Sequence, residues 1–216
     1  MAPAARSAAT AGGDGGGASW TIAYGAAESP PIARASAGAS PPRADPCAVR
    51  AGRTSASAQS TLALVTRVYV GLGSNIGDRE HMLRRALTLL AETPGVEVVA
   101  ISSFRETEPV GFADQPRFLN AAAAVETDRV PCELLERLLE IERALGRTRV
   151  GPRFGPRAID LDLLLYGDAV LDEPGLRVPH PSLHERRFAL EPLAELDPEL
   201  VVPGRGAVFG LLSALD

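Results

Sequence analysis

The sequence predicts an α+β domain whose elements follow one another as β-α-β-β-α-β, the order of the ferredoxin-like fold, with added helices toward the C-terminus. Two observations predict this class. Four segments of strand character and two amphipathic helical segments alternate in that order from residue 66 onward. Residues 1–65 have no periodic apolar positions, so we expect a low-complexity, disordered extension there and one domain over residues 66–216.

The first half of this pattern places one helix between strands. RVYVGLGS (67–74) indicates a short buried strand that ends in a turn, and residues 78–92 indicate an amphipathic helix that Asp78 can cap. Residues 96–104 alternate as a strand does. Residues 118–127 indicate another strand, after a polar loop that contains prolines.

The second half begins with a helix over residues 130–146, where Pro131 suits the first turn and Gly146 ends the apolar periodicity. AIDLDLLLYG (158–167) indicates the fourth strand of the sheet. We expect a further helix around 185–196 and a short one near the C-terminus. The two long helices should then cover one face of the sheet.

Charge and composition exclude several classes of partner. The formal net charge is -5, so the chain lacks the broad basic field that attracts nucleic acid. No apolar run approaches the roughly 20 residues that cross a bilayer, so we expect no membrane partner. Cys47 and Cys132 are far apart and have no metal-ligand spacing, which favours two free thiols in a reducing cytoplasm.

Residues 1–65 are dominated by Ala, Gly, Ser, Pro and Arg, and they lack the apolar segment of a secretory signal. They weakly resemble an organelle transit peptide, because they contain Arg and Ser and few acids. A disordered tail, or translated sequence upstream of the true start, fits better. We assign these residues no function.

The most informative stretch is RTRVGPRFGPRAIDLD (147–162), in which four arginines in a loop with Gly and Pro precede two aspartates. Because side chains alternate along a strand, Asp160 and Asp162 should share one face while Leu161 points into the core. Carboxylates at that spacing suit Mg²⁺, and guanidinium groups bind phosphate oxygens. The alternative is a set of salt bridges between these arginines and acids. We favour a clamp for a Mg²⁺-polyphosphate, since a static ion-pair cluster adds little stability.

Two other motifs remain ambiguous. GLGSNIG (71–77) lacks the GxGxxG spacing of a dinucleotide site, and a tight strand-to-helix turn capped by Asn75 or Asp78 is at least as well supported as ligand contact. His180 and His184 have the spacing of a metal pair, but no third ligand accompanies them, so zinc is disfavoured. His180 is a better candidate for a phosphate or nucleotide contact.

A second substrate is suggested by ETEPVGFADQPRFLNAAAA (106–124). Asn120 can donate and accept hydrogen bonds in a fixed amide pattern. Phe118 and Phe188 could stack on a flat heterocycle. The alternative is that both phenylalanines belong to the core.

Taken in order and spacing, five motifs resemble the 6-hydroxymethyl-7,8-dihydropterin pyrophosphokinase family of folate biosynthesis. They are YVGLGSNIGDR, SSFRETEPVG, DQPRFLNAA, RFGPRAIDLDLLLYG and VPHPSLHERRFALEPLAEL. The resemblance extends from Val68 to about Gly204, and GPR-x-IDLD is its most specific part. It implies transfer of a diphosphoryl group from ATP to the hydroxymethyl oxygen of the pterin, with release of AMP. ATP and the pterin are then the partners, and the chain is expected to act as a monomer.

The resemblance also assigns roles by position. It implies that Asp160 and Asp162 hold two Mg²⁺ ions and that they form the catalytic set together with Arg153 and Arg157. The residues implied to contact the phosphates and nucleotide are Arg147, Arg149, Arg153 (on a mobile loop that closes over the site), Arg157, Leu163, Arg177, His180 and Arg186. The residues implied to bind the pterin are Thr107, Val110 and Asn120, with Phe118 and Phe188 on either side of its ring.

Some positions depart from the commonest pattern of the family. Phe154 stands where tryptophan is frequent, Ala158 where threonine is frequent, Phe118 where tyrosine is often found, and Pro181 at a position that is often aromatic. These changes put loop-closure rates and ATP affinity in doubt, not the reaction. One rival function is a non-catalytic sensor of Mg-ATP, which would need no pterin pocket, so Phe118, Asn120 and Phe188 together argue against it. The other is a γ-phosphoryl kinase or nucleotidyltransferase with the same metal pair. Spacing alone cannot choose which phosphorus is attacked, and only the family resemblance does.

Overall fold

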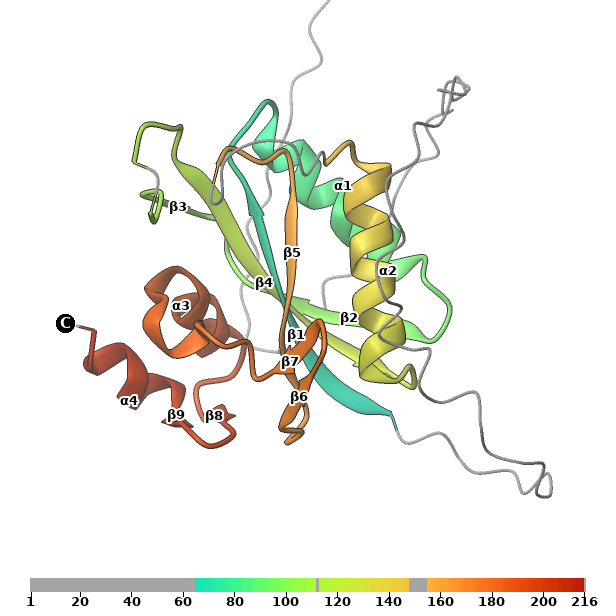
Figure 1. The fold of residues 1–216 in the computed structure, drawn as a ribbon, viewed down its shortest axis with the longest axis vertical. Helices are drawn as coiled ribbons and strands as arrows, with labels where there is room; N and C mark the ends of the chain where they lie inside the picture. The colour runs from blue at the N-terminus through green and yellow to red at the C-terminus, as the bar shows by residue number, and fades with distance from the viewer. Residues whose placement is uncertain (1–64, 112, 148–154, 216) are drawn as a thin grey trace, which may run out of the picture. The chain divides into compact units, whose positions relative to one another are not determined.

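The computed structural model describes residues 65–111, 113–147 and 155–215, and Figure 1 shows their arrangement. The strands are β1 (Thr66–Ser74), β2 (Val96–Ile101), β3 (Arg105–Thr107), β4 (Phe118–Thr127), β5 (Asp160–Tyr166), β6 (Leu171–Glu173), β7 (Leu176–Val178), β8 (Val201–Val202) and β9 (Gly206–Ala207). The helices are α1 (Arg79–Ala91), α2 (Pro131–Ala144), the 3-10 turn η2 (Leu183–Glu185), α3 (Arg187–Leu196) and α4 (Val208–Ser213).

The main sheet has the strand order β2-β4-β1-β5, and β3 pairs with the N-terminal end of β4. All of these pairings are antiparallel. The long helices α1 and α2 cover one face of the sheet, whereas α3 and α4 lie on the other side (Figure 1). The α+β class predicted from the sequence is confirmed.

Apolar side chains from alternate residues of the strands build a separate core on each face. Val68, Val70 and Leu72 of β1 point toward α1 and α2 and pack in one cluster with Leu83 and Leu138. A second cluster lies on the side of α3 and holds the ring of Tyr69 together with Ala122, Leu190 and Leu193. The sheet is therefore the middle layer, and a ligand site must lie where one of the two outer layers is incomplete.

Most element boundaries follow the sequence pattern. The strand predicted over residues 118–127 has those bounds, and the side chain of Asp78 caps α1 by accepting a hydrogen bond from the His81 N–H at 3.0 Å. The strand predicted over 96–104 is shorter than expected. It ends at Ile101. The Ser102 N–H still donates to the Ala122 carbonyl of β4 at 2.9 Å, and the separate strand β3 then pairs with the start of β4.

Two further observations concern membrane-spanning helices and the state of the cysteines. None of the helices in the described ranges is both long and apolar enough to cross a membrane. Cys132, near the start of α2, is disulfide-bonded. The expectation of a free thiol is therefore wrong for this residue.

Candidate active site

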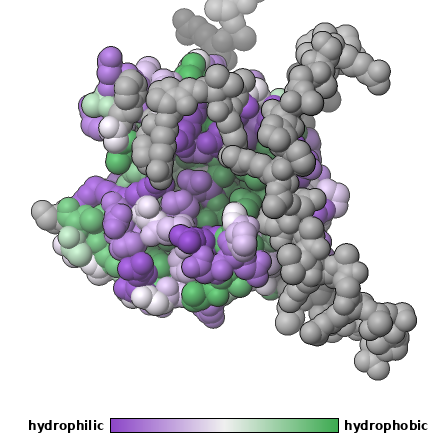
Figure 2. All heavy atoms as spheres, viewed as in Figure 1, coloured by the Kyte–Doolittle hydropathy of each residue, from purple (hydrophilic) through white to green (hydrophobic). Residues whose placement is uncertain are grey.

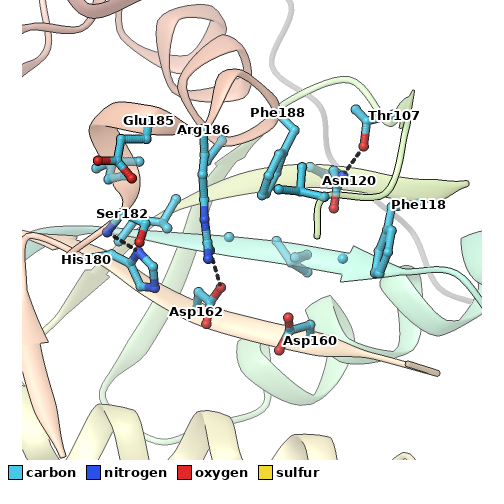
Figure 3. A pocket seen from close by; sticks show the side chains of 18 of the residues that line it. Thr107, Phe118, Asn120, Asp160, Asp162, His180, Ser182, Glu185, Arg186 and Phe188 are labelled. Atoms are coloured by element: carbon cyan, nitrogen blue, oxygen red, sulfur yellow. Dashed lines mark hydrogen bonds and ion pairs between the residues drawn. The ribbon is translucent and has the colours of Figure 1, made fainter. Parts of the chain in front are cut away.

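A cavity of about 280 Å³ opens on the α3 side of the sheet, and β1 forms its floor (Figure 3). The strand register decides what meets there. Gly73 pairs with Asp160 of β5 on one side and with Asn120 of β4 on the other, while Gly71 pairs with Asp162. The two glycines thus leave a strip without side chains between an acidic edge and an amide. Alternate glycines in a strand mark such an open surface, so the motif at residues 71–77 contributes more than the predicted turn.

Asp160 and Asp162 reach into this cavity from the same face of β5 (Figure 3). The intervening Leu161 and the flanking Ile159 and Leu163 are at most 4% exposed and pack into the core beneath. This alternation is the one predicted from the sequence. It brings two carboxylates close together on a surface that solvent can reach.

The two carboxylates have different electrostatic surroundings. Asp160 forms ion pairs with Arg147 and Arg157, and 19% of its side chain is exposed. Asp162 keeps 39% of its side chain exposed, and the Arg186 Nη1 lies 3.9 Å from its Oδ2. Desolvation in the cavity, and then the negative charge of Asp160, raise the pKa of Asp162 to about 6. The pair thus carries a repulsion that a bound cation would relieve.

These acids fit Mg²⁺ better than they fit a metal held by protein ligands alone. Within the described part of the chain, no group of three or more His, Cys, Asp or Glu side chains is placed to hold a metal ion. Mg²⁺ needs only one or two carboxylates when substrate phosphates and water complete its shell. The donor set of Asp160 and Asp162 therefore suits this ion.

The two described arginines of the predicted clamp lie on either side of Asp160. Arg147 follows α2 and Arg157 precedes β5, and both guanidinium groups form ion pairs with the Asp160 carboxylate. The salt-bridge alternative is therefore present at these two residues. It does not preclude phosphate binding, because each guanidinium has five N–H donors. Arg149 and Arg153 lie outside the described residues.

A buried acid behind the site was not anticipated. Glu142 of α2 is 2% exposed, forms an ion pair with Arg147, and accepts a hydrogen bond from the Leu161 N–H at 2.8 Å. It therefore contacts both the first arginine of the cluster and the backbone between the two aspartates. One signal was available in the sequence. Glu142 lies four residues after Leu138, on the apolar stripe of the helix, where a charged residue needs a specific partner.

His180 lies at the cavity just before η2 (Figure 3). Its backbone N–H donates to the Leu164 carbonyl at 2.9 Å, and its Nδ1 accepts a hydrogen bond from the Ser182 N–H at 3.3 Å. Burial, and then the charge of Arg186, lower the pKa of His180 to about 4. The imidazole is therefore neutral near pH 7, with Nε2 as the donor that it offers to a ligand. His184 does not line this cavity.

The other end of the cavity holds all five residues that the resemblance assigns to the pterin. Asn120 donates a hydrogen bond to the Thr107 hydroxyl at 2.7 Å, and a Cβ on Gly73 would lie 2.7 Å from the Asn120 Oδ1. The rings of Phe118 and Phe188 enter from β4 and α3 respectively (Figure 3). Val110 also lines the cavity and is 63% exposed.

A second cavity, of about 650 Å³, adjoins the first and shares Asp162 and His180 with it. Its lining includes Leu163 and Arg177, the two remaining residues predicted to meet the nucleotide, together with Leu135 of α2. The acidic edge thus lies between two adjoining spaces.

Comparison with known proteins identifies the family. The model of the family described as 7,8-dihydro-6-hydroxymethylpterin-pyrophosphokinase (HPPK) matches residues 69–198. The chain belongs to the HPPK family. This match runs from Tyr69 in β1 through α3 and includes every residue that lines the two cavities named above.

Two bacterial relatives are similar over nearly their whole length, and both are named 2-amino-4-hydroxy-6-hydroxymethyldihydropteridine pyrophosphokinase. The protein of Methylorubrum extorquens is 51% identical over 152 residues, which are 70% of this chain and 95% of that protein. The protein of Pseudomonas aeruginosa is 43% identical over 151 residues, which are 70% of this chain and 93% of that protein.

Solved structures of Plasmodium falciparum HPPK-DHPS resemble the fold of this HPPK chain. The A437G protein with STZ-DHP aligns with a TM-score of 0.56 at 14% sequence identity, over 72% of this chain and 46% of that one. This chain therefore spans less than half of those longer proteins. At this identity the likeness shows the fold alone.

Proposed function

We propose that this HPPK chain transfers a diphosphate group from ATP to 6-hydroxymethyl-7,8-dihydropterin, giving the pterin diphosphate and AMP in folate biosynthesis. One observation carries the proposal. A paired-carboxylate edge suited to Mg²⁺ and a polar, phenylalanine-walled pocket face each other across the glycine strip of β1, within one cavity. Family membership supports the same reaction.

The nucleotide end is proposed to comprise the acids, the cationic groups and the second cavity. Asp160 and Asp162 would hold Mg²⁺, and we propose two ions. The residues proposed to contact the phosphates are Arg147, Arg149, Arg153, Arg157, His180 and Arg186. Leu163 and Arg177 would meet the adenine, which is supported by the position of both residues in the cavity that adjoins the acids.

The pterin end is proposed to read a flat, hydrogen-bonding ring. Asn120 is 7% exposed and fixed by Thr107, so its amide presents donor and acceptor in one orientation. The rings of Phe118 and Phe188 would stack on the two faces of the pterin. The guanidinium of Arg186 lies 5.6 Å from the centre of the Phe188 ring, which supports α3 as a wall common to both substrates.

The chemistry requires the hydroxymethyl oxygen to bond to the β-phosphorus while the bond between that phosphorus and the oxygen of the α-phosphate breaks. The hydroxyl proton passes to water, and AMP leaves. Mg²⁺, when bound, neutralises phosphate charge. The protein's own part is to orient the alcohol against the phosphorus and to supply guanidinium and imidazole donors to the phosphate oxygens. We assign no general base.

The remaining predictions concern the organisation of the chain. We propose that residues 66–216 form the pyrophosphokinase domain and that its topology is ferredoxin-like, which is supported by the strand order β2-β4-β1-β5 with α1 and α2 on one face. The monomeric state stays a prediction that sedimentation can test. The cytoplasmic location, and the absence of nucleic-acid and membrane partners, also stay predictions.

The deciding experiment is to incubate the protein with Mg²⁺, ATP and the hydroxymethyl pterin and then to separate the nucleotides. AMP that forms only when the pterin is present supports the proposal. ADP would indicate a γ-phosphoryl kinase, and release of inorganic diphosphate with transfer of AMP would indicate a nucleotidyltransferase. Nucleotide binding without any product would favour the Mg-ATP sensor.

A further inference from the structure

Asn75 lies between β1 and α1 and is 2% exposed, although its side chain is polar. A buried amide has to find partners for its oxygen and its nitrogen, because leaving them without hydrogen bonds costs free energy. Asn75 does not cap α1, since Asp78 does so. Its four hydrogen bonds instead reach two segments that are remote in the sequence.

The first segment is the backbone of Arg157. The Asn75 Oδ1 accepts a hydrogen bond from the Arg157 N–H at 2.7 Å, and the Asn75 N–H donates to the Arg157 carbonyl at 3.0 Å. The backbone of Arg157 is thus fixed through both of its polar groups. Its side chain continues to Asp160 at the acidic edge.

The second segment precedes β4. The Asn75 Nδ2 donates to the Gln115 Oε1 at 3.0 Å and to the Pro116 carbonyl at 3.1 Å. Pro116 lies two residues before Phe118, whose ring lines the other end of the cavity. One buried side chain therefore holds the entry to the stacking residue and the backbone of the arginine at the acidic edge.

We infer that Asn75 is a positioning residue that couples the nucleotide and pterin subsites, and this inference rests on the proposed function. A shift of the Arg157 backbone when phosphates bind changes the geometry of the Asn75 amide, and this alters the segment at residues 115–118. By thermodynamic reciprocity the pterin acts on the nucleotide by the same factor. No contact between Asn75 and either substrate is required.

The choice of an amide follows from the contacts. An aspartate would keep an acceptor for the Arg157 N–H, and the Gln115 amide could rotate to donate to it, but it would present oxygen to the Pro116 carbonyl, where a donor is needed. Asn75→Asp therefore breaks the bond to the backbone before Phe118 and leaves the bonds to Arg157. Gln115→Ala removes the other bond of the Asn75 Nδ2 at a residue outside the core, so it tests the same link if Asn75→Asp does not fold.

The test measures pterin affinity by isothermal titration, with and without Mg²⁺ and an ATP analogue whose α and β phosphorus atoms are joined by methylene. Circular dichroism on the same samples, with and without the analogue, checks that each variant is folded, because a ligand that stabilises the folded state would otherwise change the ratio of the two dissociation constants. We expect a wild-type ratio of about 10 or more, which falls toward one in Asn75→Asp and partly in Gln115→Ala. Asp78→Ala, in the same turn, is the control. It should lower thermal stability through the lost cap and keep the wild-type ratio.

The outcomes distinguish a failure of the coupling role of Asn75 from a failure of the proposed function. A wild-type ratio of one, or a wild-type ratio retained by both Asn75→Asp and Gln115→Ala, would overturn the inference while leaving the proposed function intact. A loss of the ratio in Asp78→Ala equal to that in Asn75→Asp would also overturn it, because general loosening of the turn would then suffice. Wild-type protein that binds no pterin would overturn the proposed function, and the inference with it.

Discussion

The two faces of the sheet are built from alternate residues of the same strands, but a second layer completes only one of them. Under α1 and α2, Val70 and Leu72 are at most 3% exposed. On the other face α3 packs against Tyr69, whereas Gly71 and Gly73 lie beyond this cluster and line the cavity. The space-filling view in Figure 2 shows hydrophilic and hydrophobic surface side by side on the described part of the molecule.

This difference explains where charge can be placed. On the covered face, the acid Glu142 is compatible with the core because Arg147 and the Leu161 N–H satisfy its carboxylate. On the open face, Asp160 and Asp162 lie together with partial exposure and incomplete compensation. We therefore expect mutations on the α1 and α2 face to lower mainly the stability of the fold. Mutations on the open face should lower mainly the activity.

The largest effect is expected on the open face. Asp160→Ala and Asp162→Ala should each lower turnover by about 10³-fold, because the loss of a carboxylate ligand removes several kcal/mol of charge stabilisation. The fold should survive, since both side chains are partly exposed. AMP formation and circular dichroism measured on the same samples test this prediction. Near-normal AMP production by either variant would refute the proposed metal role.

The next effect is expected on the covered face. Glu142→Leu should reduce the free energy of unfolding by about 3 kcal/mol, because it leaves a buried N–H and part of a buried ion pair without a partner. Denaturant unfolding measures this change. Glu140→Gln on the same helix is the matched control. The Glu140 side chain is 54% exposed and forms a surface pair with Arg137, so the expected change is below about 1 kcal/mol. Equal losses in the two variants would contradict the special role of Glu142.

A smaller effect concerns pH. The pKa of His180 is lowered from 6.5 to about 4, first by burial and then by Arg186, with Asp160 opposing the shift. As pH falls from 6.5 toward 4, the imidazole becomes protonated in the unfolded chain but stays neutral in the folded chain. The free energy of unfolding therefore decreases across this pH range. We expect about 1–2 kcal/mol of wild-type stability to be lost between pH 7 and pH 5 through this group.

His180→Gln isolates this contribution because glutamine does not titrate. In unfolding experiments at pH 7, 6 and 5, the wild type should lose about 1–2 kcal/mol more stability than the variant between pH 7 and pH 5. The raised pKa of Asp162, which favours the folded state as pH falls, acts in both proteins and cancels in this difference. An equal loss in both proteins would show that the imidazole is protonated as readily in the folded chain as in the unfolded chain. The shift concerns the free protein, because bound phosphates would raise the pKa of the imidazole.

Sequence reasoning succeeded where the information is local. The alternation of Asp160, Leu161 and Asp162 fixed which residues share a face, and apolar periodicity placed β4 and α2 almost to the residue. The members of the pterin pocket followed from motif resemblance rather than from periodicity. Their presence in one cavity agrees with that prediction, while their roles remain proposals.

The residues that sequence reasoning missed depend on partners far along the chain. Asn75 bonds to the Arg157 N–H 82 positions away, and Glu142 bonds to the Leu161 N–H 19 positions away. A short-range sequence pattern assigns Asn75 to a turn, and it cannot identify the partners of Glu142. Gly71 and Gly73 were placed in the first strand, and the motif that contains them left a turn and ligand contact as alternatives. Their importance appears only when the register places them beside Asp160, Asp162 and Asn120.

The smallest effect is a direct test of the open strip on β1. In Gly73→Ala the new methyl group would lie 2.7 Å from the Asn120 Oδ1, so the amide that is fixed by Thr107 must shift. We expect KM for the pterin to rise about tenfold, the equivalent of roughly one buried hydrogen bond, with a smaller change in KM for ATP. Steady-state kinetics with each substrate varied in turn make the measurement. Gly210→Ala is the matched control, since its added Cβ meets no atom within 4 Å on α4. If both variants leave the pterin KM unchanged, the pterin ring does not lie against the glycine strip of β1. The function of the open face would then depend on the two acids alone.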